Sequence, residues 1–260
     1  MTWMRGEDVL GNIAILKFDW KTSMNEKKKE ALQYLKKHKN VRTVLEKSGK
    51  FKGRLRTMKT KFLAGEKNLE ALYRESGCDF RFNVESCYFS SRLASERLEI
   101  AKMVRKGESI LVLFGGVAPF AVVIAKISGA KRVVSVELGR ECCKYARINV
   151  KRNKVDDIVE IVQGDVMKVL PRTKEKFDRI VMARPNLSNS FLDVAFSHIK
   201  KGGIIHYYGF YEEDKIDEMR NMILDEARRA KKRIKIIGIK KAGDIGAYKF
   251  RYRVDLKVLN

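Results

Sequence analysis

Residues with the types and spacing of a nucleoside-cofactor site stand near three successive strand ends. Two adjacent glycines in LFGGVAPF separate an apolar strand from a helix that begins near Pro119. Glycine lets the backbone approach a ligand closely, and proline suits the first turn of a helix. The segment therefore predicts a ligand cradle, although a tight turn without a ligand has the same pattern. The cradle residues are Phe114, Gly115, Gly116, Pro119 and Phe120.

A carboxylate stands at the end of each of the next two predicted strands. Glu137 follows the glycines by about 20 residues, where an acid accepts the ribose hydroxyls of an adenosine cofactor. Asp165 in QGDV is expected to meet the adenine edge. Either acid alone is more often a helix cap or a surface charge, but together with the glycines they favour an adenosine site. Because GGVAP lacks the GxGxxG spacing of pyrophosphate loops, we favour S-adenosylmethionine over NAD.

The elements that must position these residues alternate between strand and helix. Such alternation predicts a mostly parallel sheet covered on both faces, and the final two strands read as an antiparallel pair. The fold class is therefore α/β, a Rossmann-like class I methyltransferase sheet of seven strands. Strands are expected at 110–114, 133–137, 158–162, 179–183, 203–208, 234–239 and 248–258, and helices at 119–128, 139–153, 165–170, 188–200 and 213–231.

The first third of the chain has a different pattern of predicted strands and helices. A turn and a short strand are expected within 6–18, a helix over 25–40, and extended segments at 41–46 and 80–84. We interpret residues 1–90 as a small α+β domain that contacts RNA. Residues 91–260 are then the domain that binds S-adenosylmethionine.

The chain is strongly basic and has enough apolar residues to form a core. Its 260 residues include 56 Lys and Arg against 32 Asp and Glu, a formal net charge of +24, and 45% are hydrophobic. No apolar run is long enough to span a membrane, and the first residues lack the plan of a secretory signal. The four cysteines fit neither metal spacing nor a disulfide framework. We expect a cytoplasmic protein with buried thiols, no membrane association and no metal.

The excess positive charge is concentrated in two runs without acids. Residues 47–61 contain seven Lys or Arg, and residues 228–241 contain eight. One such run is often only a solvated surface. Two favour a surface that follows nucleic-acid phosphates.

Several longer segments carry a resemblance to a known family. These are GEDVLGNIAIL, VRTVLEKSG, FLAGEKN, CYFSSRLASER, LFGGVAPF, ARPNLSNSFLDVA and GGIIHYYGF. Together they resemble the archaeal and eukaryotic tRNA (guanine-37-N1) methyltransferases and the related wybutosine-pathway aminocarboxypropyl transferases. YFSSRLASER and GGIIHYY are the most specific of them, and the resemblance covers nearly the whole chain.

The resemblance implies roles for individual residues. Glu96 falls on the proposed general base, and Arg92 and Arg56 fall on the catalytic and guanine-contacting arginines. Tyr88 and Pro185 fall on substrate-contacting positions. Guanine N1 carries a proton, so a carboxylate must remove it as the methyl arrives, while cations stabilise charge that develops toward O6. The spacing of Arg92 and Glu96 places them on one helix face if a helix has begun there, although an ordinary surface ion pair has the same spacing.

Three positions depart from the family pattern. Val112 replaces an acid in the first sheet strand, Ala118 replaces the second loop glycine, and Ala183 replaces an asparagine after the fourth strand. The first change removes an acceptor that orients the loop. The methyl of Ala118 is expected to crowd the methionine part of the cofactor, and Ala183 cannot hydrogen-bond the base through its side chain.

The leading hypothesis is an S-adenosylmethionine-dependent transfer of methyl to N1 of guanosine 37 in tRNA. The partner is expected to be the anticodon stem-loop, bound by a monomer. A second hypothesis is a wybutosine-pathway step, either methylation of a tricyclic guanosine or aminocarboxypropyl transfer. The sequence has HYYGF where aminocarboxypropyl transferases tend to carry HYHE, so His206 and Tyr207 are read as packing at the sheet end. A third is a tRNA-binding paralogue without catalysis.

Overall fold

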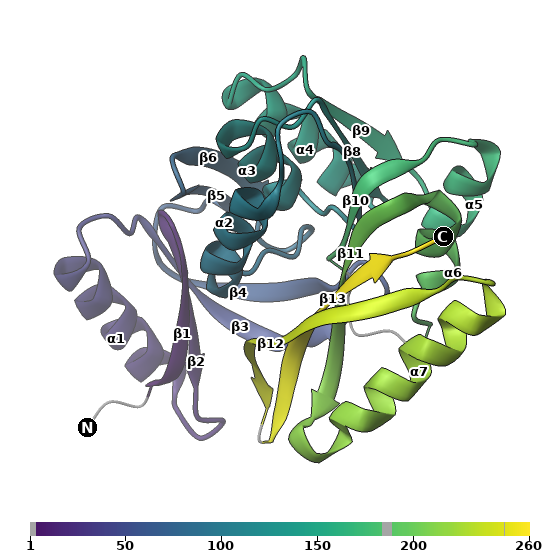
Figure 1. Cartoon of the computed structure of the whole chain (residues 1–260). Coiled ribbons are helices and arrows are strands. Elements are labelled where there is room, and N and C mark those ends of the chain that lie inside the picture. Colours follow the sequence, from purple (N-terminus) through teal and green to yellow (C-terminus); the bar gives the residue numbers. More distant parts are fainter. Residues whose placement is uncertain (1–3, 184–188, 247) are drawn as a thin grey trace.

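The computed structural model describes residues 4–183, 189–246 and 248–260. The N-terminal part contains a four-stranded sheet in the order β1-β2-β3-β4, one helix and a separate two-stranded hairpin (Figure 1). Helix α1 connects the parallel strands β2 and β3. The elements are β1 (Met4–Leu10), β2 (Ile13–Phe18), α1 (Met24–Lys37), β3 (Thr43–Lys52), β4 (Thr57–Gly65), β5 (Glu70–Glu75) and β6 (Cys78–Asn83).

The rest of the chain forms a seven-stranded sheet with the order β12-β13-β11-β10-β7-β8-β9. Strands β7 to β11 pair in parallel, and β13 lies antiparallel between β11 and β12. The strands are β7 (Ser109–Leu113), β8 (Arg132–Glu137), β9 (Val159–Gln163), β10 (Phe177–Met182), β11 (Ile199–Glu212), β12 (Ile234–Gly246) and β13 (Lys249–Val258). The helices are α2 (Ala94–Met103), α3 (Pro119–Ile127), α4 (Arg140–Arg152), α5 (Val166–Val169), α6 (Leu192–His198) and α7 (Ile216–Arg229).

Alternating residues of the central strand β7 pack into two different cores, which is why four of its five residues are apolar. In β7, Ile110 and Val112 belong to one buried cluster with residues of α3 and α4. Their neighbours Leu111 and Leu113 belong to a second cluster with residues of α6 and α7. Since both faces of the parallel sheet are covered by crossover helices at this strand, β7 buries every side chain after Ser109. The predicted fold class, including the antiparallel final pair, is confirmed.

Several element boundaries differ from those predicted. Strand β11 spans Ile199–Glu212 instead of 203–208, because its C-terminal half pairs with β13 beyond the parallel sheet. Strand β12 spans Ile234–Gly246 instead of 234–239, since the β12–β13 ladder continues to Gly246. In the N-terminal part, residues 4–10 form a strand, and β4 and β5 were not expected. The described part of α6 begins at Leu192, later than position 188.

The hairpin of β5 and β6 is fixed to helix α4 by two buried asparagines. Asn149 accepts a hydrogen bond from the Arg81 amide at 2.7 Å and donates to the carbonyl of Val117 at 3.0 Å. Asn153 exchanges hydrogen bonds with both backbone groups of Asp79, at 2.9 and 2.8 Å. The backbone polar groups on the free edge of β6 thereby find hydrogen-bond partners on α4. The bond to Val117 attaches the predicted cradle to the same helix.

The expectation of buried thiols is confirmed. All four cysteines are buried and free. His38 stacks on Tyr34, and His198 bonds two backbone carbonyls. Within the described residues, no cluster of three metal-binding side chains occurs, and no helix is long and apolar enough to cross a membrane.

Replacing Asn149 by Leu tests how the hairpin is held. The change leaves the amide of Arg81 and the carbonyl of Val117 unpaired in a buried place, which is expected to cost about 3 kcal/mol of unfolding free energy. Urea denaturation of the full chain measures it. The exposed Asn25 at the start of α1 supplies the control, and its change to Leu is expected to alter stability by less than about 0.5 kcal/mol. Equal effects of the two changes would contradict this account.

Candidate cofactor and substrate pocket

A pocket lies at the carboxyl ends of the parallel strands, where open α/β sheets bind ligands. It is closed by the turn between β3 and β4, two strands that extend from the N-terminal sheet toward the seven-stranded sheet (Figure 1). Both parts of the chain therefore contribute to one cavity. Its lining residues are Arg54, Leu55, Arg56, Tyr88, Phe89, Ser90, Leu93, Arg97, Phe114, Gly115, Gly116, Pro119, Phe120, Val136, Glu137, Leu138, Cys142, Gly164, Asp165, Val166, Ala183, Tyr208, Phe210 and Arg251.

The predicted cradle forms one wall of this pocket in an unusual backbone conformation. Phe114, Gly116 and Ala118 have φ values of 61°, 57° and 66°, in the left-handed region. A Cβ atom on Gly115 would lie 2.0 Å from Oγ of Ser135 on β8. Glycine is thus required at 115 by close contact with the neighbouring strand, which brings the loop backbone down onto the sheet edge.

Val112 and Ala118, two of the positions that depart from the family pattern, lie behind the pocket wall. Val112 is fully buried in β7, and the loop is oriented by backbone bonds from Gly115 to Val136 and from Ala118 to Gly115. Ala118 is fully buried in the core and does not line the cavity. The expectation that its methyl crowds the cofactor is therefore wrong, because the side chain packs into the core. Ala183 does line the pocket.

Glu137 joins the cradle to the next loop. One carboxylate oxygen accepts from the amide of Gly116 at 2.8 Å and the other from the amide of Gly139 at 2.6 Å. Burial raises the pKa of this carboxyl, although both amides oppose the shift. An ionised carboxylate has about four acceptor positions, so capacity remains for the two hydroxyls of a ribose.

Asp165 connects the sheet edge to the N-terminal part. It caps α5 by accepting from the amide of Met167 and pairs with Arg54 at 2.9 Å across the pocket. Burial alone would raise the pKa of Asp165, but these hydrogen bonds and the charge of Arg54 lower it. Arg54 lies in the first basic run, so part of that run faces the pocket rather than only solvent.

Arg56 and Tyr88 form a cation–aromatic stack inside the pocket. The guanidinium carbon of Arg56 lies 4.1 Å from the ring centre of Tyr88, and the ring of Phe51 meets Tyr88 edge-on at 5.0 Å. Nε of Arg56 is buried, and it has no hydrogen-bond partner among the described residues. Buried donors are rarely left unpaired, so this N–H is suited to an acceptor on a bound molecule.

Glu96 and Arg92 are separated rather than paired. The α-helix begins only at Ala94, and Arg92 lies in a 3₁₀ turn (Ser91–Leu93). Arg92 is exposed and pairs with Asp8 at 2.9 Å. Glu96 is 4% exposed and does not line the pocket. The expected shared helix face is therefore absent, because the α-helix starts two residues too late.

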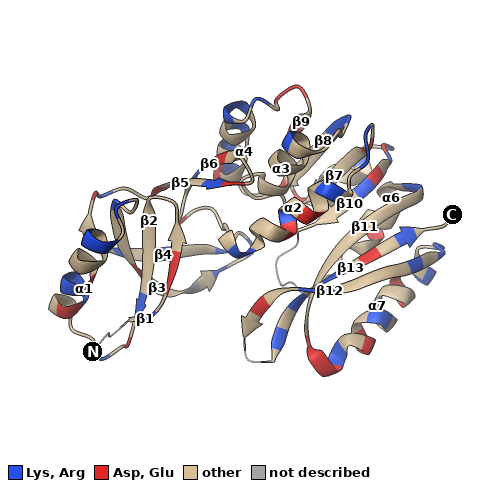
Figure 2. Cartoon of the chain, turned by 60° about the vertical axis from the view of Figure 1, so that its left-hand side comes forward, with Lys and Arg blue, Asp and Glu red and all other residues tan. Residues whose placement is uncertain are grey.

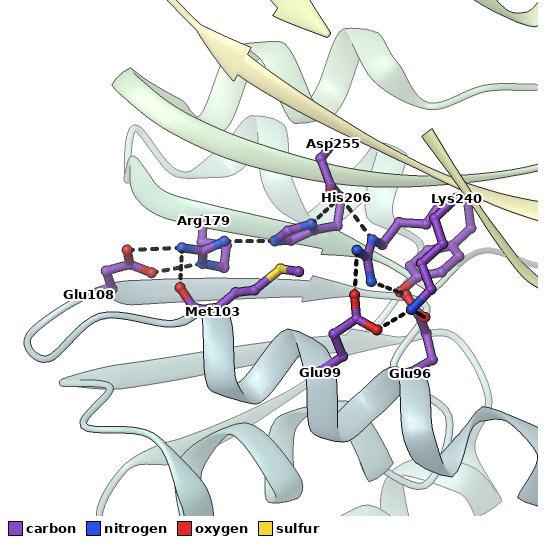
Figure 3. Close-up of polar contacts among 10 residues, drawn as sticks. Glu96, Glu99, Met103, Glu108, Arg179, His206, Lys240 and Asp255 are labelled. Carbon is purple, nitrogen blue, oxygen red and sulfur yellow. Dashed lines mark hydrogen bonds and ion pairs between the residues drawn. The ribbon is translucent and has the colours of Figure 1, made fainter. Parts of the chain in front are cut away.

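The carboxylate of Glu96 is held inside a polar cluster instead. It accepts from the hydroxyl of Tyr208 at 2.7 Å and from Arg253 at 2.6 Å, while Lys240 lies 3.9 Å away. Figure 3 shows this cluster continuing through Asp255 to His206. His206 is thus buried in the sheet, as interpreted from the sequence. Pro185 lies outside the described residues.

Arg97, Tyr208, Phe210 and Arg251 are among the pocket residues that sequence reasoning did not find. Arg97 is buried against Glu75, with a bond of 2.5 Å, and its guanidinium lies 5.0 Å from the ring centre of Phe89. Tyr208, Phe210 and Arg251 come from β11 and β13. Arg97 is one of several charges on its helix, and no spacing distinguishes it. For the residues of β11 and β13, the sequence signal that could have been used was Tyr208 in HYYGF.

Family comparisons match both parts of the chain. Residues 71–237 match the TRM5/TYW2 methyltransferase domain, and residues 4–68 match the TYW2 N-terminal domain. The chain belongs to the TRM5/TYW2 methyltransferase family. Its members include methyltransferases, and their structures supply the comparison for the pocket.

Two relatives with assigned names align with nearly all of this chain. The chain is 33% identical to tRNA (guanine(37)-N(1))-methyltransferase Trm5b of Pyrococcus abyssi, over 96% of this chain and 74% of that protein. It is 31% identical to tRNA (guanine(37)-N(1))/4-demethylwyosine(37)-methyltransferase Taw22 of Nanoarchaeum equitans, over 97% and 99%. The crystal structure of Pyrococcus abyssi Trm5b superposes with a TM-score of 0.88 at 32% identity, covering 98% of this chain and 76% of that one.

The cofactor of this TRM5/TYW2 chain is S-adenosylmethionine. The residues present fit it: a glycine cradle packed against the hydroxyl of Ser135 on β8, an acid with free acceptor capacity at 137, and a second acid at 165. A TYW2 structure from M. jannaschii in complex with AdoMet has the same fold, with a TM-score of 0.75 at 21% identity, covering 98% of this chain and 100% of that one.

A paired substitution tests the contact that fixes the cradle. Gly115→Ala is expected to weaken S-adenosylmethionine binding at least about tenfold, since its Cβ would displace the loop from Ser135. Ser135→Ala removes the clashing hydroxyl, so the double variant is expected to recover most of the affinity. Equilibrium dialysis with labelled cofactor measures both. A double variant no better than Gly115→Ala would contradict the role given to this contact.

The raised pKa of Glu137 predicts that cofactor affinity depends on pH. Its raised pKa means that lowering the pH protonates it before an ordinary glutamate, and cofactor affinity is expected to fall with that protonation. Glu137→Gln is expected to bind about 10- to 100-fold more weakly at pH 7.5 and to lose the dependence on pH between 7.5 and 5. Calorimetric titration measures this, with exposed Glu141→Gln as the control. A variant with the pH profile of the wild type would refute the assignment.

Proposed function

We propose that this chain is an S-adenosylmethionine-dependent tRNA methyltransferase that transfers a methyl group to N1 of guanosine 37. The observation that carries this proposal is a single pocket in which the cofactor cradle faces the Arg56–Tyr88 stack. The cradle comes from the seven-stranded sheet and the stack from the segments that precede it. The identity to Trm5b of Pyrococcus abyssi supports the same substrate.

The proposed cofactor contacts follow from the positions of the side chains. Glu137 accepts the ribose hydroxyls, and Asp165 lies near the adenine. The methionine part lies along the cradle. S-adenosylmethionine supplies an electrophilic methyl group when bound. The residues assigned to this contact are Phe114, Gly115, Gly116, Pro119, Phe120, Glu137 and Asp165.

The proposed substrate contacts lie on the opposite wall. A guanine flipped out of the anticodon loop stacks on Tyr88. The unpaired Nε of Arg56 donates to O6, where charge develops as N1 is methylated. Glu96 receives the N1 proton, and Arg92 contacts the RNA from outside the pocket. We keep Pro185 as a proposed substrate contact from the sequence.

Positive charge on the hairpin of β3 and β4 supports a polyanionic partner. Most of the first basic run lies on this hairpin, and Figure 2 marks Lys and Arg in blue. The turn of the hairpin lines the pocket. In the second run, Lys240 and Lys241 pair with Glu99 and Glu213, so part of that charge is neutralised within the chain. The first run is therefore the principal proposed contact with the anticodon stem. With free thiols throughout, the cytoplasm is the proposed compartment.

A second candidate reaction is methylation of 4-demethylwyosine at position 37. Two observations favour it: the N-terminal part matches the TYW2 N-terminal domain, and the alignment spans 99% of Taw22, whose name includes both activities. Both reactions use the same pocket and cofactor. A pocket lined by Ala183 in place of an amide side chain has more room for a tricyclic base.

The product identifies the reaction. The full chain is incubated with S-adenosylmethionine and an unmodified tRNA transcript that carries guanosine 37, and digested nucleosides are analysed by mass spectrometry. We expect one methyl group at N1 of guanosine and none on a matched transcript with adenosine 37. A tRNA carrying 4-demethylwyosine tests the second candidate, and a larger addition would indicate aminocarboxypropyl transfer. Binding of tRNA without any product would show that the chain is a non-catalytic paralogue.

A further inference from the structure

Tyr208 and Glu96 are joined by a hydrogen bond, and Tyr208 is the member of this pair that lines the pocket. Tyr208 lines the cavity, whereas Glu96 lies behind it on the first turn of α2. The only described side chains within hydrogen-bond distance of Glu96 are Tyr208 and Arg253. Tyr208 therefore stands between the pocket and the carboxylate to which its hydroxyl is bonded.

The cluster behind Tyr208 has a definite charge state. An arginine guanidinium cannot accept a hydrogen bond, so Nε2 of His206 accepts from Arg179 and Nδ1 donates to Asp255. Burial lowers the pKa of His206 as well. His206 is therefore neutral, with its proton on Nδ1.

The remaining groups leave one negative charge in excess. Figure 3 shows four carboxylates in this cluster, those of Glu96, Glu99, Glu108 and Asp255. Three cations oppose them: Arg179, Arg253 and Lys240. Arg253 contacts three of the carboxylates, so its charge is shared and is not matched to Glu96 alone. The formal charge of these side chains is therefore one negative unit, four carboxylates against three cations.

We infer that Tyr208 is a catalytic residue that passes the guanine N1 proton to Glu96. As the N1–methyl bond forms, the N1–H bond breaks and its proton moves to the Tyr208 oxygen. The proton of the tyrosine moves in the same step to the Glu96 carboxylate oxygen 2.7 Å away. The electron pair of N1–H becomes the N1 lone pair used in the new bond, and the broken carbon–sulfur pair stays on sulfur. This inference rests on the proposed function.

The environment of Tyr208 makes the two transfers simultaneous. Burial and the adjacent Glu96 raise its pKa well above the usual value, so a free phenolate is unfavourable. A phenol that releases one proton while it receives another never carries that charge. Arg253 is a positioning residue in this scheme, because it holds the carboxylate oxygen toward the tyrosine.

Single-turnover methyl transfer to tRNA by the full chain tests the inference. Tyr208→Phe is expected to slow transfer at least about 100-fold, as Glu96→Gln does, and the double variant is expected to be no slower than either. Cofactor affinity and unfolding temperature are read in parallel and are expected to remain near wild-type values. Tyr211→Phe, on the same strand but outside the pocket lining, is the control.

A proton inventory separates a relay from a positioning effect. Two protons in flight give the wild type a curved dependence of rate on the fraction of heavy water. Direct transfer to Glu96 gives a straight line and would overturn the inference, as would Tyr208→Phe with at least half of wild-type activity. Failure of the wild type to methylate guanosine 37 would instead reject the proposed function and the relay with it.

Discussion

The architecture of the site depends on two hydrogen bonds that the carboxylate of Glu137 accepts. It binds the amide of Gly116 in the loop after β7 and the amide of Gly139 in the loop after β8. One side chain thus fixes two adjacent strand-to-helix loops at the edge of the sheet. Gly116 lies in the left-handed region of this loop, and a Cβ atom on its neighbour Gly115 would meet the hydroxyl of Ser135.

The two parts of the chain are joined at the same place. Arg54 reaches from the β3–β4 turn to Asp165, and Arg56 from the same turn stacks on Tyr88. The buried asparagines of α4 hold the intervening β5–β6 hairpin, and one of them also binds the cradle through Val117. The residues on both walls of the pocket are therefore positioned by a shared set of polar contacts, which is an arrangement suited to reaction between two bound molecules.

Much of this was accessible from sequence because it is local. Strand and helix alternation predicted the seven-stranded sheet, and the strand-end residues Gly115, Glu137 and Asp165 do line one pocket. The surroundings of Glu96 were not predictable in this way. Its partners Tyr208 and Arg253 are more than 100 positions away in the chain, and no residue spacing reports such a contact. The place of Ala118 likewise depends on a backbone conformation that its sequence context does not reveal.

Hydrogen–deuterium exchange on the full chain, with and without S-adenosylmethionine, tests the shared pocket most directly. The account predicts that the cofactor slows exchange in the loops near 114–120, 137–141 and 164–167, and also in the β3–β4 turn at 54–56. Protection at this last turn is the decisive result, because it belongs to the N-terminal part. Slower exchange in the sheet loops with no change at 54–56 would contradict the claim that both parts form one site.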